Sequence, residues 1–286
     1  MLRRLVVAVF GCALAFVVSA TEVETAVSMS NLFWAPDRLD TTAGHTMTGT
    51  EIFWQLEGSM SQDFSDGLRF RGGVEQDTIL KRRLYADLGF DLNSLTVHFT
   101  PFVGLVNTAQ KWFNPGLEAS VQYVFPGFGF VQGGFSTSFA PLSKIGDYYL
   151  SSEFASVGIS VENGIVTFSV DDRSSIVRAT SLLDVQDYQT RYLLDTEIFY
   201  KNFPLRTNLI LGYQVLGRAY TGVSPHDTPL HSALGGLKLT LLLGPDYAVY
   251  TDWIASLFNL GLGDTVLKVP DSSLLSEFKI GLKVHL

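Results

Sequence analysis

Apolar residues occupy every second position over most of this chain, from about residue 49 to residue 286. They do so in segments of about ten residues, which are separated by Gly, Pro, Asn and Asp. Residues 83–92 are the clearest case, because Leu, Ala and Phe alternate there with Arg, Tyr, Asp and Gly. A period of two is typical of β-strands, whose successive side chains point to opposite faces. The pattern therefore predicts an all-β protein.

Short turn motifs decide which side chains share a face. Asn93-Ser94 and Asn163-Gly164 are expected to be two-residue hairpin turns. Pro126-Gly127-Phe128 and Gly244-Pro245-Asp246 must be three-residue turns if the apolar residues that flank them are to lie on one face. These tight turns alternate with longer polar connections, as in a membrane barrel. The long connections are expected at residues 107–115, 141–148, 175–188, 221–230 and 259–274.

The number of strands follows from counting back from the C-terminus. Eleven strands are expected between residues 81 and 286, and residues 49–60 add a twelfth. Two weaker segments, 67–74 and 24–34, would make fourteen. Both totals are even, as a barrel with both termini on the periplasmic side requires. We favour fourteen, with twelve as the alternative, because Leu68 and Phe70 alternate with Arg69 and Arg71.

One residue is unfavourable for a closed sheet. Pro101 interrupts the strand predicted over residues 95–106, and a proline removes one hydrogen bond from the ladder. A β-bulge is expected at that point.

The first twenty residues have the order of a secretory signal. Arg3 and Arg4 precede an uncharged apolar run, and the small-residue site Val18-Ser19-Ala20 follows it. We expect cleavage after Ala20, which leaves residues 21–286 as a single barrel domain. A membrane-anchoring helix would need about 20 apolar residues, more than the run contains. A lipoprotein signal at Cys12 is disfavoured because the apolar run continues beyond it, so the mature chain should contain no cysteine.

Composition excludes some partners and restricts how the chain meets a membrane. The sequence has 20 Lys and Arg, two of them in the first twenty residues, against 28 Asp and Glu. An acidic balance argues against nucleic-acid binding, which needs a basic face. Apolar residues make up 47% of the sequence, yet no second uncharged run approaches the length of a membrane helix. A mature chain that lies in a membrane would therefore cross it with strands.

Aromatic residues favour a membrane barrel over a soluble periplasmic β-protein. They make up 13% of the chain, and many fall at the ends of predicted strands rather than in their middle. Two such bands match the aromatic girdles at the two interfaces of a membrane barrel. The members near short turns are Phe90, Tyr123, Phe125, Tyr200, Phe203 and Tyr247, and those near long loops are Trp112, Phe113, Tyr148, Tyr149, Tyr220 and Phe258.

The C-terminal segment carries a family resemblance. Phe278, Ile280, Leu282 and Val284 alternate with polar residues and glycine up to the last residue, Leu286. This segment resembles the terminal β-signal of bacterial outer-membrane proteins, although their usual last residue is Phe. The resemblance is to the outer-membrane β-barrel superfamily, including porins and channels. It implies an antiparallel up-and-down transmembrane β-barrel in the cell outer membrane, with outer-membrane lipid and the barrel-assembly machinery as partners.

The polar face predicts a lumen of mixed charge, which favours an outer-membrane channel for passive diffusion of small hydrophilic solutes. For any single residue, a lumen salt bridge that braces the wall is the stronger expectation. Basic residues gather in the last third of the chain and would make one wall basic, with Glu51 and Glu57 brought near it by closure. The lumen-facing candidates are Arg69, Arg71, Arg83, Asp87, Asp91, His98, Glu118, Asp195, Arg206, Arg218, Lys238, Asp252, Lys279 and Lys283.

Two other function classes remain as alternatives. A structural or adhesive barrel would display its longer loops, and an outer-membrane hydrolase would need a nucleophile with a base. The five histidines form no Ser-His-Asn or Asp-His cluster in the sequence, and His98 lies between Thr96 and Thr100 on its own face. We therefore expect no enzyme activity, no catalytic residue, no metal site and no cofactor.

Overall fold

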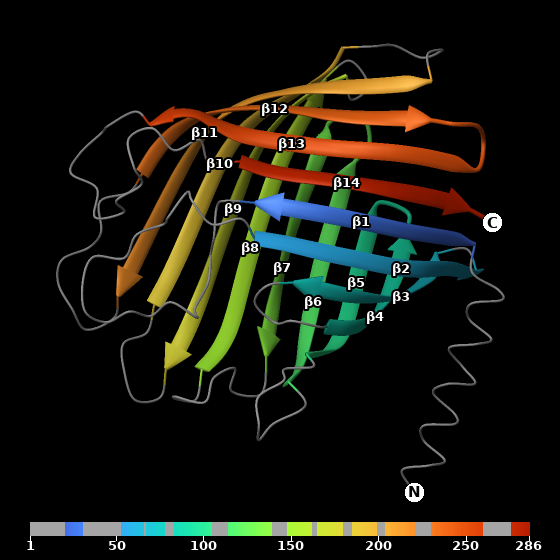
Figure 1. Cartoon of the computed structure of the whole chain (residues 1–286), viewed down its shortest axis with the longest axis horizontal. Helices are drawn as coiled ribbons and strands as arrows, with labels where there is room; N and C mark the ends of the chain where they lie inside the picture. Colours follow the sequence, from blue (N-terminus) through green and yellow to red (C-terminus); the bar gives the residue numbers. More distant parts are fainter. Residues whose placement is uncertain are drawn as a thin grey trace, which may run out of the picture.

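The computed structural model forms a closed antiparallel barrel of fourteen strands (Figure 1). It describes residues 21–30, 53–65, 67–77, 83–104, 114–138, 148–161, 165–179, 185–198, 204–220, 230–259 and 276–286. Each strand pairs with the next, and β1 pairs with β14 to close the sheet. The strands are β1 Glu22–Ser30, β2 Phe53–Ser65, β3 Leu68–Asp77, β4 Arg83–Leu92, β5 Leu95–Gly104, β6 Asn114–Phe125, β7 Gly129–Ser138, β8 Tyr148–Val161, β9 Val166–Ala179, β10 Val185–Glu197, β11 Leu205–Tyr220, β12 Leu230–Leu242, β13 Tyr247–Asn259 and β14 Ser276–His285.

The fourteen-strand prediction is confirmed, because the two weakly patterned segments form β1 and β3. The signal peptide predicted at residues 1–20 lies outside the described residues. No helix in the described part of the chain is long and apolar enough to cross a membrane. We call the barrel end that carries the short turns and Leu286 the turn end, and the opposite end the loop end.

The predicted turn registers agree with the structure. Leu92 pairs with Leu95 across Asn93-Ser94, and Asn93 takes the positive φ of 59° that a tight hairpin turn requires. Phe125 pairs with Gly129 across a three-residue turn. The amide of Leu243 donates to the carbonyl of Tyr247 at 2.9 Å. Asn163-Gly164 lies outside the described residues.

One predicted loop is wrong. Residues 175–188 were expected to form a long connection, but β9 continues to Ala179 and β10 begins at Val185. Val177 pairs with Val185, so the ladder continues past the polar pair of Ser175 and Asp187. Cross-strand backbone hydrogen bonds can prolong a strand beyond the membrane, where its outward side chains need not be apolar. The loop was predicted because the local sequence there is polar.

The bulge predicted at Pro101 is also wrong. Tyr85 pairs with Phe102 and Leu88 pairs with Phe99, so the register between β4 and β5 is the same on both sides of the proline. On the other edge of β5, Pro101 pairs with Leu117 in an unbroken ladder with β6. The strand therefore accommodates the proline by a local lapse of pairing with β4, without an extra residue. A side-chain bond from Thr100 Oγ1 to Asp87 Oδ1, at 2.7 Å, joins the two strands there.

The outer face is a belt of exposed apolar side chains. Leu84, Val121, Val157 and Leu211 are between 46% and 50% exposed, although the chain has enough interior to bury them. Such a belt is unstable in water and matches the lipid-facing surface of a membrane barrel. It ends toward the loop end at Asp172, whose carboxylate accepts a bond from Thr190 Oγ1 at 2.8 Å on the outer face.

An aromatic girdle lies at the turn end of this belt. Phe90, Tyr123, Phe125 and Tyr247 are between 40% and 49% exposed there, as predicted. The rings of Tyr123 and Phe125 contact each other edge to face, with centroids 4.8 Å apart. Of the other aromatic residues predicted for the girdles, Tyr148, Tyr149, Tyr220 and Phe258 lie toward the loop ends of their strands, and Trp112, Phe113, Tyr200 and Phe203 lie outside the described residues.

Aromatic rings on the inner face lie over glycines of the neighbouring strand. A Cβ atom at Gly281 would lie 2.4 Å from the ring of Tyr250, and one at Gly73 would lie 2.4 Å from the ring of Tyr85. Each ring faces its glycine directly across the ladder, so the ring covers a backbone that has no side chain of its own. The same arrangement joins Phe102 to Gly116, Phe154 to Gly134 and Phe130 to Gly158.

We predict that Gly281→Ala destabilises the barrel, because its new methyl group would displace the ring of Tyr250. Overpacking of this kind costs about 1–3 kcal/mol. The matched control is Gly58→Ala, whose nearest new neighbour is Val74 Cγ1 at 3.9 Å. The measurement is the urea midpoint at which the folded, faster-migrating gel band disappears. Equal midpoints for the two variants would contradict the ring-over-glycine packing.

We also predict that the two faces of β6 tolerate charge differently. Val121→Arg places a charge on the lipid-facing belt and should cost about 2–4 kcal/mol near the membrane centre. Gln122→Arg, on the adjacent inward position, should cost much less because its side chain meets the polar lumen. Folding yield into lipid vesicles reports both variants. A greater loss for Gln122→Arg would mean that the faces are reversed.

Candidate functional site

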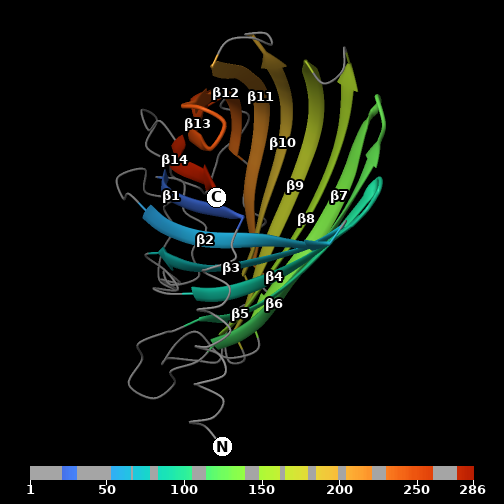
Figure 2. The same ribbon diagram turned by 90° about the vertical axis from the view of Figure 1, so that its right-hand side faces the viewer.

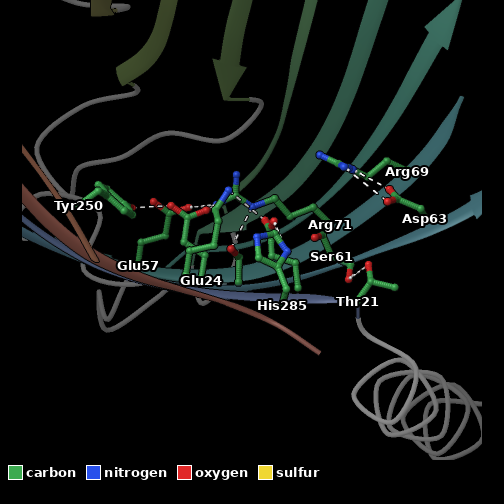
Figure 3. Close-up of polar contacts among 12 residues, drawn as sticks. Thr21, Glu24, Glu57, Ser61, Asp63, Arg69, Arg71, Tyr250 and His285 are labelled. Atoms are coloured by element: carbon green, nitrogen blue, oxygen red, sulfur yellow. Dashed lines mark hydrogen bonds and ion pairs between the residues drawn. The ribbon is translucent and has the colours of Figure 1, made fainter. Parts of the chain in front are cut away.

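The barrel lumen contains an ion-pair cluster that spans the closing seam. We call Glu24, Glu57, Arg71, Tyr85, Tyr250 and Lys279 the closure cluster; they come from β1, β2, β3, β4, β13 and β14 in that order. Arg71 Nη2 lies 2.9 Å from Glu24 Oε2 and 2.9 Å from Glu57 Oε1. Figure 3 shows Arg71 reaching both carboxylates, with Tyr250 on the far side of Glu24. One guanidinium therefore ties three successive strands together.

Tyrosine and lysine extend this cluster to its two ends. The hydroxyl of Tyr85 donates to Glu57 Oε1 at 2.9 Å, and that of Tyr250 donates to Glu24 Oε1. Lys279 Nζ lies 3.7 Å from Glu57 Oε2. Nearer the turn end, Lys283 Nζ lies 3.2 Å from Glu22 Oε1, and Arg69 Nε lies 2.7 Å from Asp63 Oδ1. The charges of this wall are thus matched within the wall.

A second polar group lies on β3 to β6. Arg83 Nη1 is 2.7 Å from Glu118 Oε1, and Arg83 Nε is 3.6 Å from Glu75. The guanidinium also lies 4.4 Å from the ring centroid of Phe102, within the range of a cation–π contact. Ser136 Oγ donates to the same Glu118 oxygen at 3.1 Å. This pairing leaves Glu118 with a compensated charge.

Side chains fill the lumen along β10 to β14. Ile210, Leu216 and Leu234 point inward and are at most 3% exposed, and Gln214 is 1% exposed. The void among Arg191, Gln214, Leu234 and their neighbours is only about 10 Å³, the space of one water molecule at most. This side of the lumen is therefore packed as closely as a protein core.

A charged bridge crosses the packed side. Arg191 on β10 contacts the carboxylate of Glu277 on β14, with Nη1 3.3 Å from Oε2, although three strands separate them in the sheet. Arg191 Nε also donates to Gln214 Oε1 at 2.8 Å. The bridge lies over the apolar side chains of β11 and β12 and holds the two edges of this wall together.

The wall formed by β6 to β9 is different. Its inward positions carry mainly Ser, Gln and Gly, among them Ser120, Gln122, Gln132 and Ser152. Among the described residues, none of the buried hydrophobic or polar side chains belongs to these four strands. A cavity of about 270 Å³ opens on their inner face, with Thr100 of β5 at its edge. Figure 2 shows these strands curving opposite β14, β1 and β2.

Most of the predicted lumen residues contact other side chains of the lumen. Besides the contacts above, Lys238 Nζ lies 2.8 Å from Asp195 Oδ2, and Thr96 Oγ1 donates to Asp91 Oδ1 at 2.7 Å. Asp252 faces Lys238 and Lys279 across its two ladders. Arg206 takes an inward position at the turn end and has no ion pair among the described residues. Arg218 lies on β11, outside the part whose side chains are described.

Three of the five residues predicted for a basic wall have their charge matched. Lys238, Lys279 and Lys283 each have a carboxylate partner, namely Asp195, Glu57 and Glu22. Closure brings Glu57 beside β14, as expected. There its carboxylate lies next to Lys279 and neutralises that charge. Glu51 lies outside the described residues.

Several residues that line the lumen were not predicted from the sequence. Glu22 and Glu24 lie on β1, where the alternation of apolar and polar residues is too weak to assign the two faces of the strand from the sequence. Asp171 and Arg173 lie in a stretch that reads as the approach to a polar loop. Their signal was the period-two continuation from Val166 to Val170, which puts both on the face opposite to the valines.

His98 forms a pair with Asp87 that the linear sequence does not reveal. His98 Nδ1 lies 2.9 Å from Asp87 Oδ2, and Ser120 is the residue opposite His98 on β6. However, the imidazole leans toward β4, where a Cβ at Gly89 would lie 3.2 Å from its Cε1 atom. The ring therefore turns toward Asp87 and away from the serine, an arrangement that braces strands. The described residues contain no group of three or more His, Cys, Asp or Glu that could hold a metal ion.

Comparisons with known proteins agree on the fold. A search of protein-family models finds no match, and no curated protein is similar at a significant level. Among solved structures, a bacterial polysaccharide outer membrane secretin superposes with a TM-score of 0.59 at 11% identity, over 94% of this chain and 99% of that one. OmpT of Vibrio cholerae gives 0.46 at 11%, over 93% and 96%, and an anion-selective porin from Comamonas acidovorans gives 0.41 at 12%, over 93% and 98%. The secretin, whose TM-score exceeds 0.5, shows that the chain has the fold of a bacterial outer-membrane β-barrel.

Proposed function

We propose that this outer-membrane barrel is a channel for passive diffusion of small hydrophilic solutes and has no enzymatic activity. The observation that carries the proposal is the asymmetry of the lumen: side chains pack the β10–β14 side, whereas none of the buried side chains described lies on β6 to β9. A barrel of fourteen strands also encloses more space than one of eight, whose side chains fill it. The route is therefore expected along the β6–β9 wall.

The chemistry of this route favours polar solutes. Hydroxyl and amide side chains line it, and they can replace the hydrogen bonds that a solute loses with water. Arg83 and Glu118 are paired at 2.7 Å. A solute therefore meets a mainly polar surface, on which Arg173 is an exposed cation without an ion pair among the described residues.

The proposed surroundings of the barrel follow from its outer face and last strand. Outer-membrane lipid would cover the apolar belt, since that belt has no other apolar surface to pack against. Strand β14 would be the segment that the barrel-assembly machinery recognises, because it keeps strict alternation to Leu286. A structural or adhesive barrel would share both properties, so only solute passage separates the two proposals.

The first test is conductance of refolded protein in planar bilayers, with liposome swelling in small sugars as a second measure. We expect discrete channels and swelling rates that fall with the size of the sugar. Folded protein, identified by its heat-modifiable gel band, that gives neither current nor swelling would contradict the channel and favour the structural barrel.

A cysteine test then places the route. The only cysteine, Cys12, lies in the expected leader, so engineered thiols should be alone in the mature chain. Ser152→Cys on β8 should react with a charged, water-soluble methanethiosulfonate reagent and lose a large part of its current. Gln214→Cys, on the packed β11 wall where the native side chain is 1% exposed, should react slowly and keep its current. The reverse result would place the route on the other side of the lumen.

A further inference from the structure

We propose that the β6–β9 wall holds a binding subsite for small hydroxylated carboxylates, with Arg173 as the group that receives the carboxylate. The inference deepens the proposed channel function and rests on it, because the subsite lies on the expected route. It concerns one cavity and the inward side chains that line it.

The cavity of about 270 Å³ lies on the lumen side of the wall. Its inward lining comes from five strands, β5 to β9, so it is built by the curvature of the sheet and not by one loop. The lining residues that the argument uses are Glu118, Ser120, Ser136, Ser152, Phe154 and Arg173.

Arg173 is the unmatched cation of this cavity. Its side chain is exposed, and it has no ion pair among the described residues. In contrast, Arg71, Arg83 and Arg191 each contact at least one carboxylate. A guanidinium presents two parallel N–H donors that fit the two oxygens of a carboxylate. Arg173 can offer this pair of donors to a solute because no described side chain uses them.

The acidic groups near Arg173 fix which solute fits. Glu118 is matched by Arg83 and accepts a bond from Ser136, so its charge does not compete with a bound anion. Asp171 lies two positions nearer the turn end on the same face, where Ser156 Oγ donates to it. A bound anion should therefore sit on the cavity side of Arg173, away from Asp171.

The neutral part of the cavity suits a hydroxylated solute. The hydroxyls of Ser120 and Ser152 line it and make no side-chain hydrogen bond within the described residues. Phe154 adds an apolar group, and its ring covers Gly134, where a Cβ would be 2.6 Å from the ring. Its register partner on β9 is Arg173. A carbon chain that bears hydroxyls and one carboxylate can use the hydroxyls, the ring and the guanidinium together.

The experiment is a current-block titration on the refolded full mature chain in planar bilayers at about 0.1 M salt, where charges are screened only beyond about 10 Å. The probe is sodium gluconate, with sorbitol as its uncharged counterpart and sodium chloride to match ionic strength. We expect gluconate to reduce the current in a saturable way and sorbitol to have little effect. Arg173→Gln should raise the half-blocking gluconate concentration about tenfold or more, as loss of a charge-assisted hydrogen bond predicts.

The matched control is Arg206→Gln, which removes the other inward arginine without an ion pair in the described lumen, at the turn end. It should leave the half-blocking concentration within about twofold of the unsubstituted channel, a difference small on the scale of one hydrogen bond. Ser120→Ala with Ser152→Ala should weaken block by gluconate but not by acetate, which has no hydroxyls. All variants must first show the heat-modifiable folded band.

The outcomes separate the two proposals. A folded chain without conductance contradicts the channel function itself. A conducting channel that gluconate does not block, or blocks equally in the unsubstituted and Arg173→Gln forms, overturns the subsite and leaves the channel intact. Equal weakening by Arg173→Gln and Arg206→Gln also overturns it, because it would show a general effect of lumen charge. Unchanged gluconate block in the double serine variant would overturn the requirement for hydroxyls.

Discussion

Closure of the sheet is the constraint on which the rest of this structure depends. In a lipid environment each unpaired backbone amide or carbonyl costs several kcal/mol, so the first and last strands must pair along their whole length. Here β1 and β14 do so over every residue of β1, from Glu22 opposite His285 to Ser30 opposite Glu277. Strand β1 is rich in polar residues and has little apolar surface of its own. Its two glutamates compensate for this, because Lys283 and Arg71 hold them from opposite sides of the seam.

The ion pairs between strands determine which charged groups of the lumen would remain available to a solute in the proposed channel. Most of the lumen cations are committed to carboxylates of neighbouring strands, and removing one partner would leave the other exposed to a partly desolvated environment. The pairs therefore act first as braces between strands, and only a group outside them can discriminate among solutes. The lumen of this barrel contains many charged side chains, and most of its described cations are paired with carboxylates. In the proposed channel, selectivity would depend on the few groups that the bracing leaves unused, and among the described residues the cations of this kind are Arg173 and Arg206.

The sequence predicts the fold well and the site only in part, for a physical reason. Alternation and turn length determine each strand's faces and register locally, which is why the fourteen strands and the described turns were predicted correctly. Contacts across several strands depend on the curvature of the closed sheet, so nothing local predicts that Arg191 reaches Glu277 or that Arg173 has no ion pair among the described residues. The two errors in the fold have local causes: polar residues made residues 175–188 resemble a loop, and Pro101 seemed to need a bulge.

The inward side chains of the two sides of the lumen differ in kind. On β5 to β8, Phe102, Phe130 and Phe154 cover glycines of the adjacent strand, an arrangement that β13 and β14 share only at Tyr250 and Gly281 among the described residues. The packed side uses branched side chains such as Ile210 and Leu234, which point inward and are at most 3% exposed. Both arrangements stiffen the wall by contact between side chains. Only the packing of rings over glycines leaves open space beside the wall. The glycines of β6 to β8 therefore make a rigid wall that is compatible with the proposed solute route.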